Sequence, residues 1–115
     1  MSADLLEEFL SSGVVRGIEY IEAGDLRTIS TRFFEAIGGI GADPGALSPE
    51  ELRATLERGL PPLYPAADPL GQRTIDVLRT YLAFLEPRTG PERARRLVEA
   101  LEECAEPLRE KIRSG

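Results

Sequence analysis

The sequence predicts an all-α protein, an irregular antiparallel bundle of four to five helices that forms a single domain over residues 1–115. Two observations predict this class. Apolar residues recur at intervals of three and four along most of the chain, which is the spacing of one helix face. Strand and helix patterns do not alternate, so a parallel sheet is not expected. A Gly/Pro-rich loop at 38–47 and a proline-rich connector at 60–69 separate the helical segments.

The first predicted helix begins near Ser2 or Asp4 and has an apolar face at helical spacing. Gly13 and Gly17 fall on that face if the helix continues, and small residues four positions apart let a second helix approach closely. We therefore treat these two glycines as a candidate helix-contact face. The alternative is that segment 11–13 ends a short helix, because its three helix-weakening residues cost about 2 kcal/mol relative to Ala. The sequence leaves both alternatives open.

The second predicted helix begins at Asp25, and Gly24 ends the segment before it. It runs to about Ile37 and has an apolar repeat formed by Leu26, Ile29, Phe33 and Ile37. The loop 38–47 that follows has glycines like those of a phosphate-binding loop. It follows a helix rather than a strand, however, and it has no Lys, so we interpret it as a flexible connector.

A capping box starts the third predicted helix, with Ser48 as the N-cap residue and Glu51 at the third helical position. This helix runs to about Arg58, and Gly59 ends it. The next segment, 60–69, is too rich in proline for a helix or a central strand. We expect its apolar side chains to hold an extended segment against the bundle.

The central element is a predicted helix from Asp68 to Glu86, which has the densest apolar face in the chain. Asp68 is its predicted N-cap, and Pro87 is expected to end it because the residue before a proline disfavours helical geometry. The second and last helices are its expected neighbours, through Phe33, Ile37, Leu97 and Leu101. Its expected exposed strip is narrow and consists of Arg73, Asp76, Thr80 and Ala83.

The last predicted helix follows a second capping box at Thr89 and Glu92 and keeps its apolar repeat to Ile112. Pro107 displaces a backbone hydrogen bond, so we expect a kink or a break near it. Cys104 lies beside the apolar face. We interpret it as a small structural hydrophobe, because the sequence near it offers no base partner for a reactive thiol.

Charge is unevenly distributed along the chain. Residues 1–47 contain 8 acidic residues and 3 arginines, so most of the formal net charge of −6 lies in the first half. Nucleic-acid and anionic-membrane binding need clustered positive charge and are not expected, whereas a basic protein partner is compatible with this balance. The acidic N-terminus and the short apolar runs predict neither a signal peptide nor a membrane span, so we expect a soluble cytoplasmic protein.

Positive charge is carried almost entirely by arginine. The chain has 13 Arg and one Lys, with no Asn, no His and a single Gln. This composition favours a GC-rich or thermophilic bacterial source. An idealised design is the alternative, but designed bundles contain less internal Gly and Pro, so we favour a natural chain.

The sequence contains no combination of residue types that a known catalytic or metal site requires. The lack of His removes nucleophile triads and the usual helical di-metal sites, and a single Cys excludes a thiol metal cluster. We therefore assign no catalytic, cofactor or metal residues, and a non-enzymatic protein is favoured. Acid–base catalysis by a buried carboxyl stays open, with Glu19 as the candidate in an apolar stretch.

Four arginines are the candidate binding residues. Arg93, Arg95 and Arg96 crowd the start of the last helix, and Arg88 can join them. Because the start of a helix is the positive end of its dipole, these side chains indicate an anion site or a contact for an acidic partner. The alternative is a solvated face with intrahelical ion pairs, such as that of Arg95 with Glu99.

The leading functional hypothesis is a protein-interaction module, such as a small subunit, adaptor or inhibitor of a larger assembly, that binds a protein partner or a second copy of itself. The second hypothesis is a small-ligand binder or enzyme with a cavity between helices, which an inward-facing Arg or Glu would indicate. A weaker third hypothesis is an acidic mimic of nucleic acid. It requires the acidic residues of the first half to line one surface.

Overall fold

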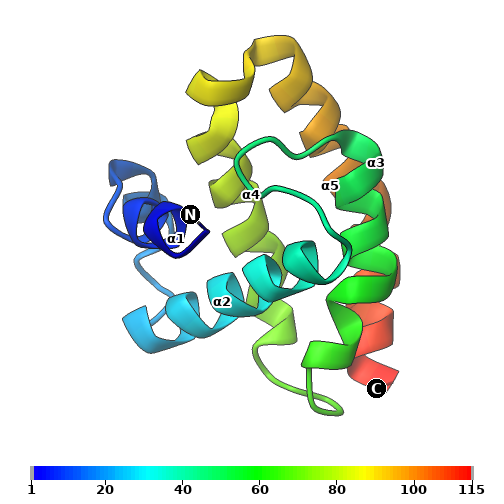
Figure 1. Ribbon diagram of the computed structural model, residues 1–115. Helices are drawn as coiled ribbons and strands as arrows, with labels where there is room; N and C mark the ends of the chain where they lie inside the picture. Colours follow the sequence, from blue (N-terminus) through cyan, green and yellow to red (C-terminus); the bar gives the residue numbers. More distant parts are fainter. Residues whose placement is uncertain (1, 115) are drawn as a thin grey trace.

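The computed structural model describes residues 2–114 (Figure 1). Within this range the chain forms five α-helices, connected by 3₁₀ turns, a π-helical turn and loops, and it contains no β-strand. The predicted all-α class is confirmed. None of the helices in this range has both the length and the hydropathy needed to cross a lipid bilayer.

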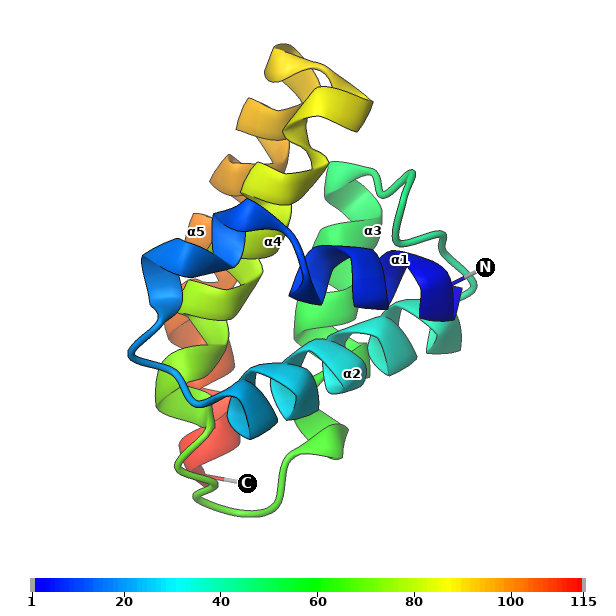
Figure 2. The same ribbon diagram turned by 90° about the vertical axis from the view of Figure 1, so that its left-hand side faces the viewer.

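Two long helices form an antiparallel hairpin on which the other helices pack, α4 (Gly71–Thr89) and α5 (Pro91–Ser114). α3 (Pro49–Ala54) lies along α5, and α2 (Ala23–Gly39) crosses the hairpin on the side of α4 (Figure 1). α1 (Ser2–Leu10) lies beside α2, as Figure 2 shows, and the turn after α1 contacts α4. α4 is therefore covered by α5 on one flank and by the first half of the chain on the other.

The core is centred on Tyr81 in α4, which is only 1% exposed. The rings of Phe9, Phe33, Phe34 and Phe84 lie with their centroids 5.2 to 5.8 Å from that of Tyr81. Those of Phe9, Phe33 and Phe34 meet it edge to face, an arrangement that contributes about 0.5–1.5 kcal/mol per pair beyond the burial of apolar surface. The four phenylalanines of the chain thus join α1, α2 and α4 around one side chain.

The expected flanks of the central helix are present. Phe33 reaches Tyr81 from α2, and α5 buries Leu97 and Leu101 completely. The expected exposed strip of α4 is only partly open to solvent, because Arg73 and Ala83 are exposed whereas Asp76 and Thr80 are half-buried.

The first helix is broken before Gly13, which settles an alternative that the sequence left open. α1 ends at Leu10, and a 3₁₀ turn follows at Gly13–Ile18. The hydroxyl of Ser11 donates to the carbonyl of Glu7 at 2.6 Å, and that of Ser12 donates to the carbonyl of Phe9 at 2.7 Å. These side chains satisfy carbonyls at the helix end, which is how serine competes with helix continuation.

α2 begins earlier than the sequence indicated. Its first residue is Ala23 and its N-cap is Glu22, so the prediction that Gly24 ends one helix and Asp25 caps the next is wrong. The segment before α2 is a turn rather than a helix, and it leaves no helix end for Gly24 to terminate. The predicted apolar repeat is confirmed, since its four members are all buried: Leu26, Ile29, Phe33 and Ile37.

The capping box that starts α3 is confirmed. The Ser48 hydroxyl accepts from the backbone N–H of Glu51 at 3.1 Å, and the Glu51 carboxylate accepts from the backbone N–H of Ser48 at 2.9 Å. After Ala54 the helix widens into a π-helical turn at Thr55–Gly59. A Cβ atom added at Gly59 would lie 3.0 Å from a backbone oxygen of α2, so this glycine permits the close contact of the turn with α2.

The proline-rich connector is held against the bundle, as expected, but Pro61–Leu63 form a 3₁₀ turn rather than an extended segment. Its Tyr64 side chain is buried and forms a 2.5 Å hydrogen bond with the hydroxyl of Thr74 in α4. The guanidinium of Arg32 in α2 lies 4.6 Å from the centroid of the Tyr64 ring and donates to Asp68 at 2.9 Å. Residues far apart in the sequence therefore hold the connector against the bundle.

Both predicted ends of the central helix are wrong. α4 begins at Gly71 because Asp68 and the next residues form a turn, in which the Asp68 carboxylate accepts from the backbone N–H of Leu70 at 3.0 Å. At the other end, the helix passes through Pro87 and ends at Thr89, and its C-cap residue Gly90 has a φ of 90° that glycine tolerates. A proline in the last turn displaces only one helical bond, and the exposed surface there lets water satisfy the released carbonyl.

α5 also passes through its proline, so no break occurs at Pro107. The predicted second capping box does not form. Thr89 belongs to α4 and donates its hydroxyl to a carbonyl of that helix, while Glu92 pairs with Arg96. Cys104 is buried on the apolar face, which agrees with its structural interpretation.

A first prediction concerns Gly71, where α4 starts against α5. A Cβ atom at this position would lie 2.6 Å from Cγ2 of Ile112, a branched side chain with little freedom to move. Gly71→Ala should therefore lower the free energy of unfolding by about 1–3 kcal/mol in urea denaturation. Gly24→Ala is the control, because it has no neighbour within 4 Å and lies in α2. It should raise stability by up to about 1 kcal/mol. Equal effects would show that the contact with Ile112 imposes no constraint.

A second prediction concerns the pH dependence of the Asp68–Arg32 pair. Burial raises the pKa of the Asp68 carboxyl, but the backbone N–H of Leu70 and the guanidinium of Arg32 outweigh this effect and hold the pKa below its ordinary 3.8. A lowered folded-state pKa stabilises the protein above the unfolded pKa and ceases to do so as pH falls through the folded value. Asp68→Asn should therefore cost about 1–2 kcal/mol near neutral pH and progressively less below pH 3.8. A cost independent of pH, measured by urea denaturation across this range, would exclude the charge as its cause.

Candidate functional site

The loop between α2 and α3 is anchored at two points. The Tyr81 hydroxyl donates to the carbonyl oxygen of Pro44 at 2.7 Å in the protein interior. Burial raises the pKa of Tyr81, so the hydroxyl stays a donor at neutral pH. Farther along, Nε of Arg93 in α5 donates to the carbonyl of Leu47 at 3.2 Å, and the Leu47 side chain is fully buried. The second half of the loop is thus pinned to both helices of the hairpin, which the interpretation as a flexible connector missed.

This anchored loop faces α1 across a surface hollow of about 560 Å³. The blue helix α1 and the loop after α2 lie side by side in Figure 2. Three carboxylates line the hollow together with three apolar residues and one arginine. They are Asp4, Leu5 and Glu8 from α1, Ala42, Asp43 and Pro44 from the loop, and Arg88 from the end of α4. We call this feature the acidic hollow.

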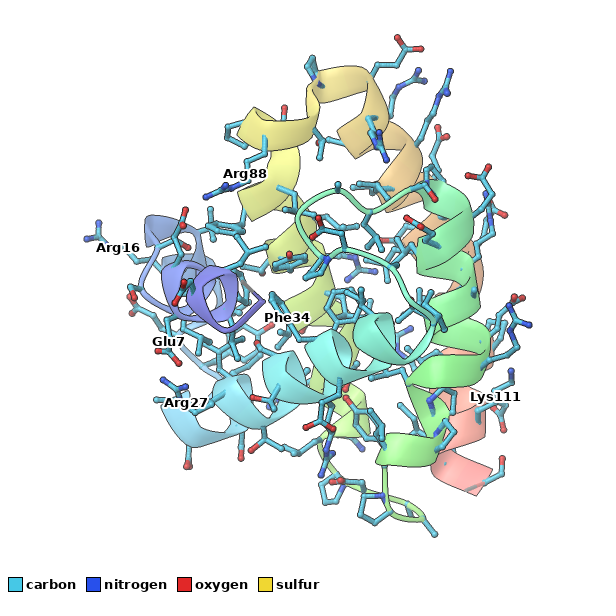
Figure 3. The ribbon with its side chains drawn as sticks, viewed as in Figure 1. Glu7, Arg16, Arg27, Phe34, Arg88 and Lys111 are labelled. Atoms are coloured by element: carbon cyan, nitrogen blue, oxygen red, sulfur yellow. The ribbon has the colours of Figure 1, made fainter. Side chains whose placement is uncertain are left out.

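The charges of the acidic hollow are only partly neutralised. Arg88 pairs with Glu8, and its guanidinium lies 5.4 Å from the centroid of the Phe84 ring, so it reaches from α4 toward α1 (Figure 3). Asp4 and Asp43 form no ion pair within the part of the chain that the structure describes. One oxygen of Asp43 accepts from the backbone N–H of Gly45 at 2.9 Å and so shapes the loop. The hollow therefore keeps excess negative charge beside apolar surface.

The four arginines predicted as one binding site do not line one common hollow in the structure. Arg88 belongs to the acidic hollow, and Arg93 is turned toward the loop carbonyls. Arg95 pairs with Glu99 at 3.9 Å, the intrahelical pair that the sequence offered as the alternative. Arg96 and Arg93 line another hollow of about 720 Å³ at the starts of α3 and α5.

An anion in that second hollow would meet opposing charge, because Glu92 also lines it and pairs with Arg96 at 3.2 Å. Three of the four arginines therefore already have carboxylate partners, and the fourth has backbone acceptors. A contact of these residues with an acidic partner or anion stays a prediction.

Gly13 and Gly17 do not lie on an α-helical face. They belong to the 3₁₀ turn, both are exposed, and a Cβ atom at either position would have no neighbour within 4 Å. The glycines that permit close approach within the chain are Gly59 and Gly71 instead. A contact of the 13–18 turn with another chain stays a prediction.

The interior offers little catalytic chemistry over residues 4–114. Its buried polar residues are Ser30, Thr55 and Thr74, and none of its arginines or glutamates is buried. Glu19, the candidate for a buried carboxyl, is exposed. Burial raises the pKa of the Cys104 thiol, which disfavours the reactive thiolate. Groups of three or more potential metal-ligating side chains were not found among the described residues.

Comparisons with protein-family models, curated proteins and solved structures find no match to this chain. Its function is therefore inferred from its surface chemistry. Sequence reasoning did not single out the acidic hollow, although the excess of acidic residues before position 48 was its available signal. The convergence of Asp4, Glu8 and Asp43 depends on how the loop and α1 pack, which spacing alone does not encode.

A third prediction tests the anchor of the loop. Tyr81→Phe keeps the ring and its aromatic contacts but removes the buried bond to the Pro44 carbonyl. The unsatisfied carbonyl should lower the free energy of unfolding by about 1–3 kcal/mol. Amide hydrogen exchange should accelerate in residues 42–48 more than in α5, since the loop loses one of its two anchors. Unchanged exchange in the loop would contradict the anchoring role.

Proposed function

We propose that this protein is a non-enzymatic interaction module that binds a basic segment of a partner protein in the acidic hollow. The observation that carries the proposal is the convergence of Asp4, Glu8 and Asp43 from two separate segments on one hollow with apolar lining. Carboxylates on opposite walls can accept hydrogen bonds from the same guanidinium or ammonium group.

The apolar part of the lining favours a side chain over a free inorganic cation. Leu5, Ala42 and Pro44 offer surface to the methylene stem of an arginine or lysine, whose charged end can then reach the carboxylates. A single basic side chain fits within about 560 Å³, and the open hollow leaves room for the adjoining backbone. This combination of charge and apolar surface supports a protein partner.

Long-range charge and local rigidity support the same proposal. The formal net charge of −6 would raise the rate at which a basic partner is encountered, and this effect would fall with added salt. Tyr81 and Arg93 hold the loop before any partner arrives, so little loop entropy would be lost on binding.

A mimic of nucleic acid has less support. Some acidic residues of the first half are neutralised within the chain, since Glu7 pairs with Arg27 at 2.5 Å and Glu8 pairs with Arg88. Glu7 and Arg27 point toward each other between α1 and α2 in Figure 3. The remaining acids lie on several elements, so a regular row of negative charge like that of a phosphate backbone is not formed.

The test uses a labelled peptide of alternating arginine and leucine and its citrulline analogue, which is neutral and nearly isosteric. In fluorescence anisotropy, the arginine peptide should bind and the citrulline peptide should not. Asp4→Asn with Asp43→Asn should weaken binding about tenfold, because two attractive charges are removed. Asparagine at position 43 retains an oxygen that can accept from the N–H of Gly45, so the loop should keep its shape.

The matched control replaces two exposed acids outside the hollow, Glu19→Gln with Glu35→Gln, and changes the net charge equally. This variant should weaken binding by less than about twofold, because distant exposed charges are screened by salt. Equal weakening by both double variants would show that only net charge matters. That result, or equal binding of the citrulline peptide, would refute the proposed site.

A further inference from the structure

A separate hollow of about 500 Å³ lies at the opposite end of the α4–α5 hairpin. It is formed where the connector enters α4 and where the last turns of α5 pass beside it, at the lower end of the hairpin in Figure 1. Its lining differs in charge from that of the acidic hollow. Arg109 and Arg113 of α5 line one wall, with Gln72 of α4 also in the lining.

The two guanidinium groups are available to an incoming anion. Arg109 and Arg113 lie four residues apart, so they are on the same face of α5. Each is paired with a carboxylate three residues earlier, Glu106 at 2.7 Å and Glu110 at 3.3 Å. Such exposed pairs contribute at most about 1 kcal/mol, so a better-placed anion can replace these partners.

The acidic residue in the lining of this hollow, Asp68, already accepts hydrogen bonds within the chain. Asp68 accepts from Arg32 at 2.9 Å and from the backbone N–H of Leu70 at 3.0 Å. Its charge still opposes a multiply charged ligand. Glu106 and Glu110 lie outside the lining, so a ligand that displaces them meets two arginines and one aspartate there, an excess of one positive charge that fits a monoanion better than a phosphate dianion.

The remaining lining is apolar and well fixed. Ile112 packs against Gly71, and Pro69 also lines the hollow. Ala67 adopts a φ of 55°, and its backbone N–H donates to the carbonyl of Ile112 at 3.2 Å, so the connector is tied to α5 at this point. An apolar group can therefore contact a wall that is in place before binding.

We propose that this hollow binds a small organic carboxylate. Its carboxylate group accepts from Arg109 and Arg113, with the Gln72 amide as a further donor, and its apolar body lies against Ile112 and Pro69. The site is independent of the acidic hollow, because the two share no lining residue. The protein would thus bind a small acid at one end of the hairpin and a basic protein segment at the other.

The test uses benzoate as the probe and benzamide as its neutral counterpart, in two-dimensional amide NMR titrations at constant ionic strength. Benzoate should produce saturable shifts at the backbone amides of Gly71, Gln72 and Ile112, with millimolar affinity. Benzamide should bind much more weakly. Arg109→Gln and Arg113→Gln should each weaken benzoate binding about tenfold, because each removes a charge-assisted hydrogen bond.

Arg16→Gln is the matched control. Arg16 is exposed, and its replacement removes the same charge, but it is outside this hollow. Benzoate affinity should not change in this variant. The proposal is overturned if benzoate causes no saturable shifts at these amides, if benzamide binds equally well, or if the control weakens binding as much as the other two variants. Thermal midpoints of all three variants confirm that each remains folded.

Discussion

The arrangement of the first half of the chain depends on the environment of Tyr81. Its ring meets the rings of Phe9 from α1 and of Phe33 and Phe34 from α2, while its hydroxyl holds the carbonyl of Pro44. One buried side chain thus sets the positions of α1, α2 and the loop before α3 relative to α4. The aromatic contacts set the distances of α1 and α2 from α4. The hydrogen bond of the hydroxyl is directional, so it also sets the orientation of the loop.

The acidic hollow follows from this arrangement. Phe9 and Pro44 are both tied to Tyr81, and their neighbours in sequence, Glu8 and Asp43, line the same hollow. Charged groups that repel one another are therefore brought together by contacts in the core. Proteins commonly place such unfavourable surface charge where a partner of opposite charge can bind, which links the packing of this core to the proposed function.

The two ends of the α4–α5 hairpin differ because the chain supplies different neighbours to them. The end with Arg88 is covered by the acidic first half, whereas the end with Gly71 lies beside the arginines of the last turns of α5. The connector before α4 is attached to the first half of the chain, because Arg32 of α2 lies over the Tyr64 ring and donates a hydrogen bond to Asp68. Ligands of opposite charge are thus expected at sites with no common residue.

Local signals in the sequence predicted local structure well. The Ser48 capping box and the buried repeat from Leu26 to Ile37 needed only neighbouring residues, and both are confirmed. Pro87 was misleading because a proline near a helix end costs only one hydrogen bond, which packing and water can offset.

Tertiary features were harder to predict. Spacing drew attention to Gly13 and Gly17, yet the contacts that require glycine occur at Gly59 and Gly71, where the neighbour comes from a distant segment. The acidic hollow was not predicted for the same reason, because only the packing of the core brings Asp4 and Asp43 to the same hollow.

The central claim is that the two ends of this small bundle carry opposite local potentials, and paramagnetic relaxation measures this directly in the unmodified protein. Amide proton relaxation would be compared in a cationic and an anionic nitroxide of the same size. The account predicts that the cationic probe relaxes Leu5 and Ala42 more strongly, and that the anionic probe relaxes Gly71 and Gln72 more strongly. If the ratio of relaxation by the cationic probe to relaxation by the anionic probe is the same at both ends, the central claim is contradicted.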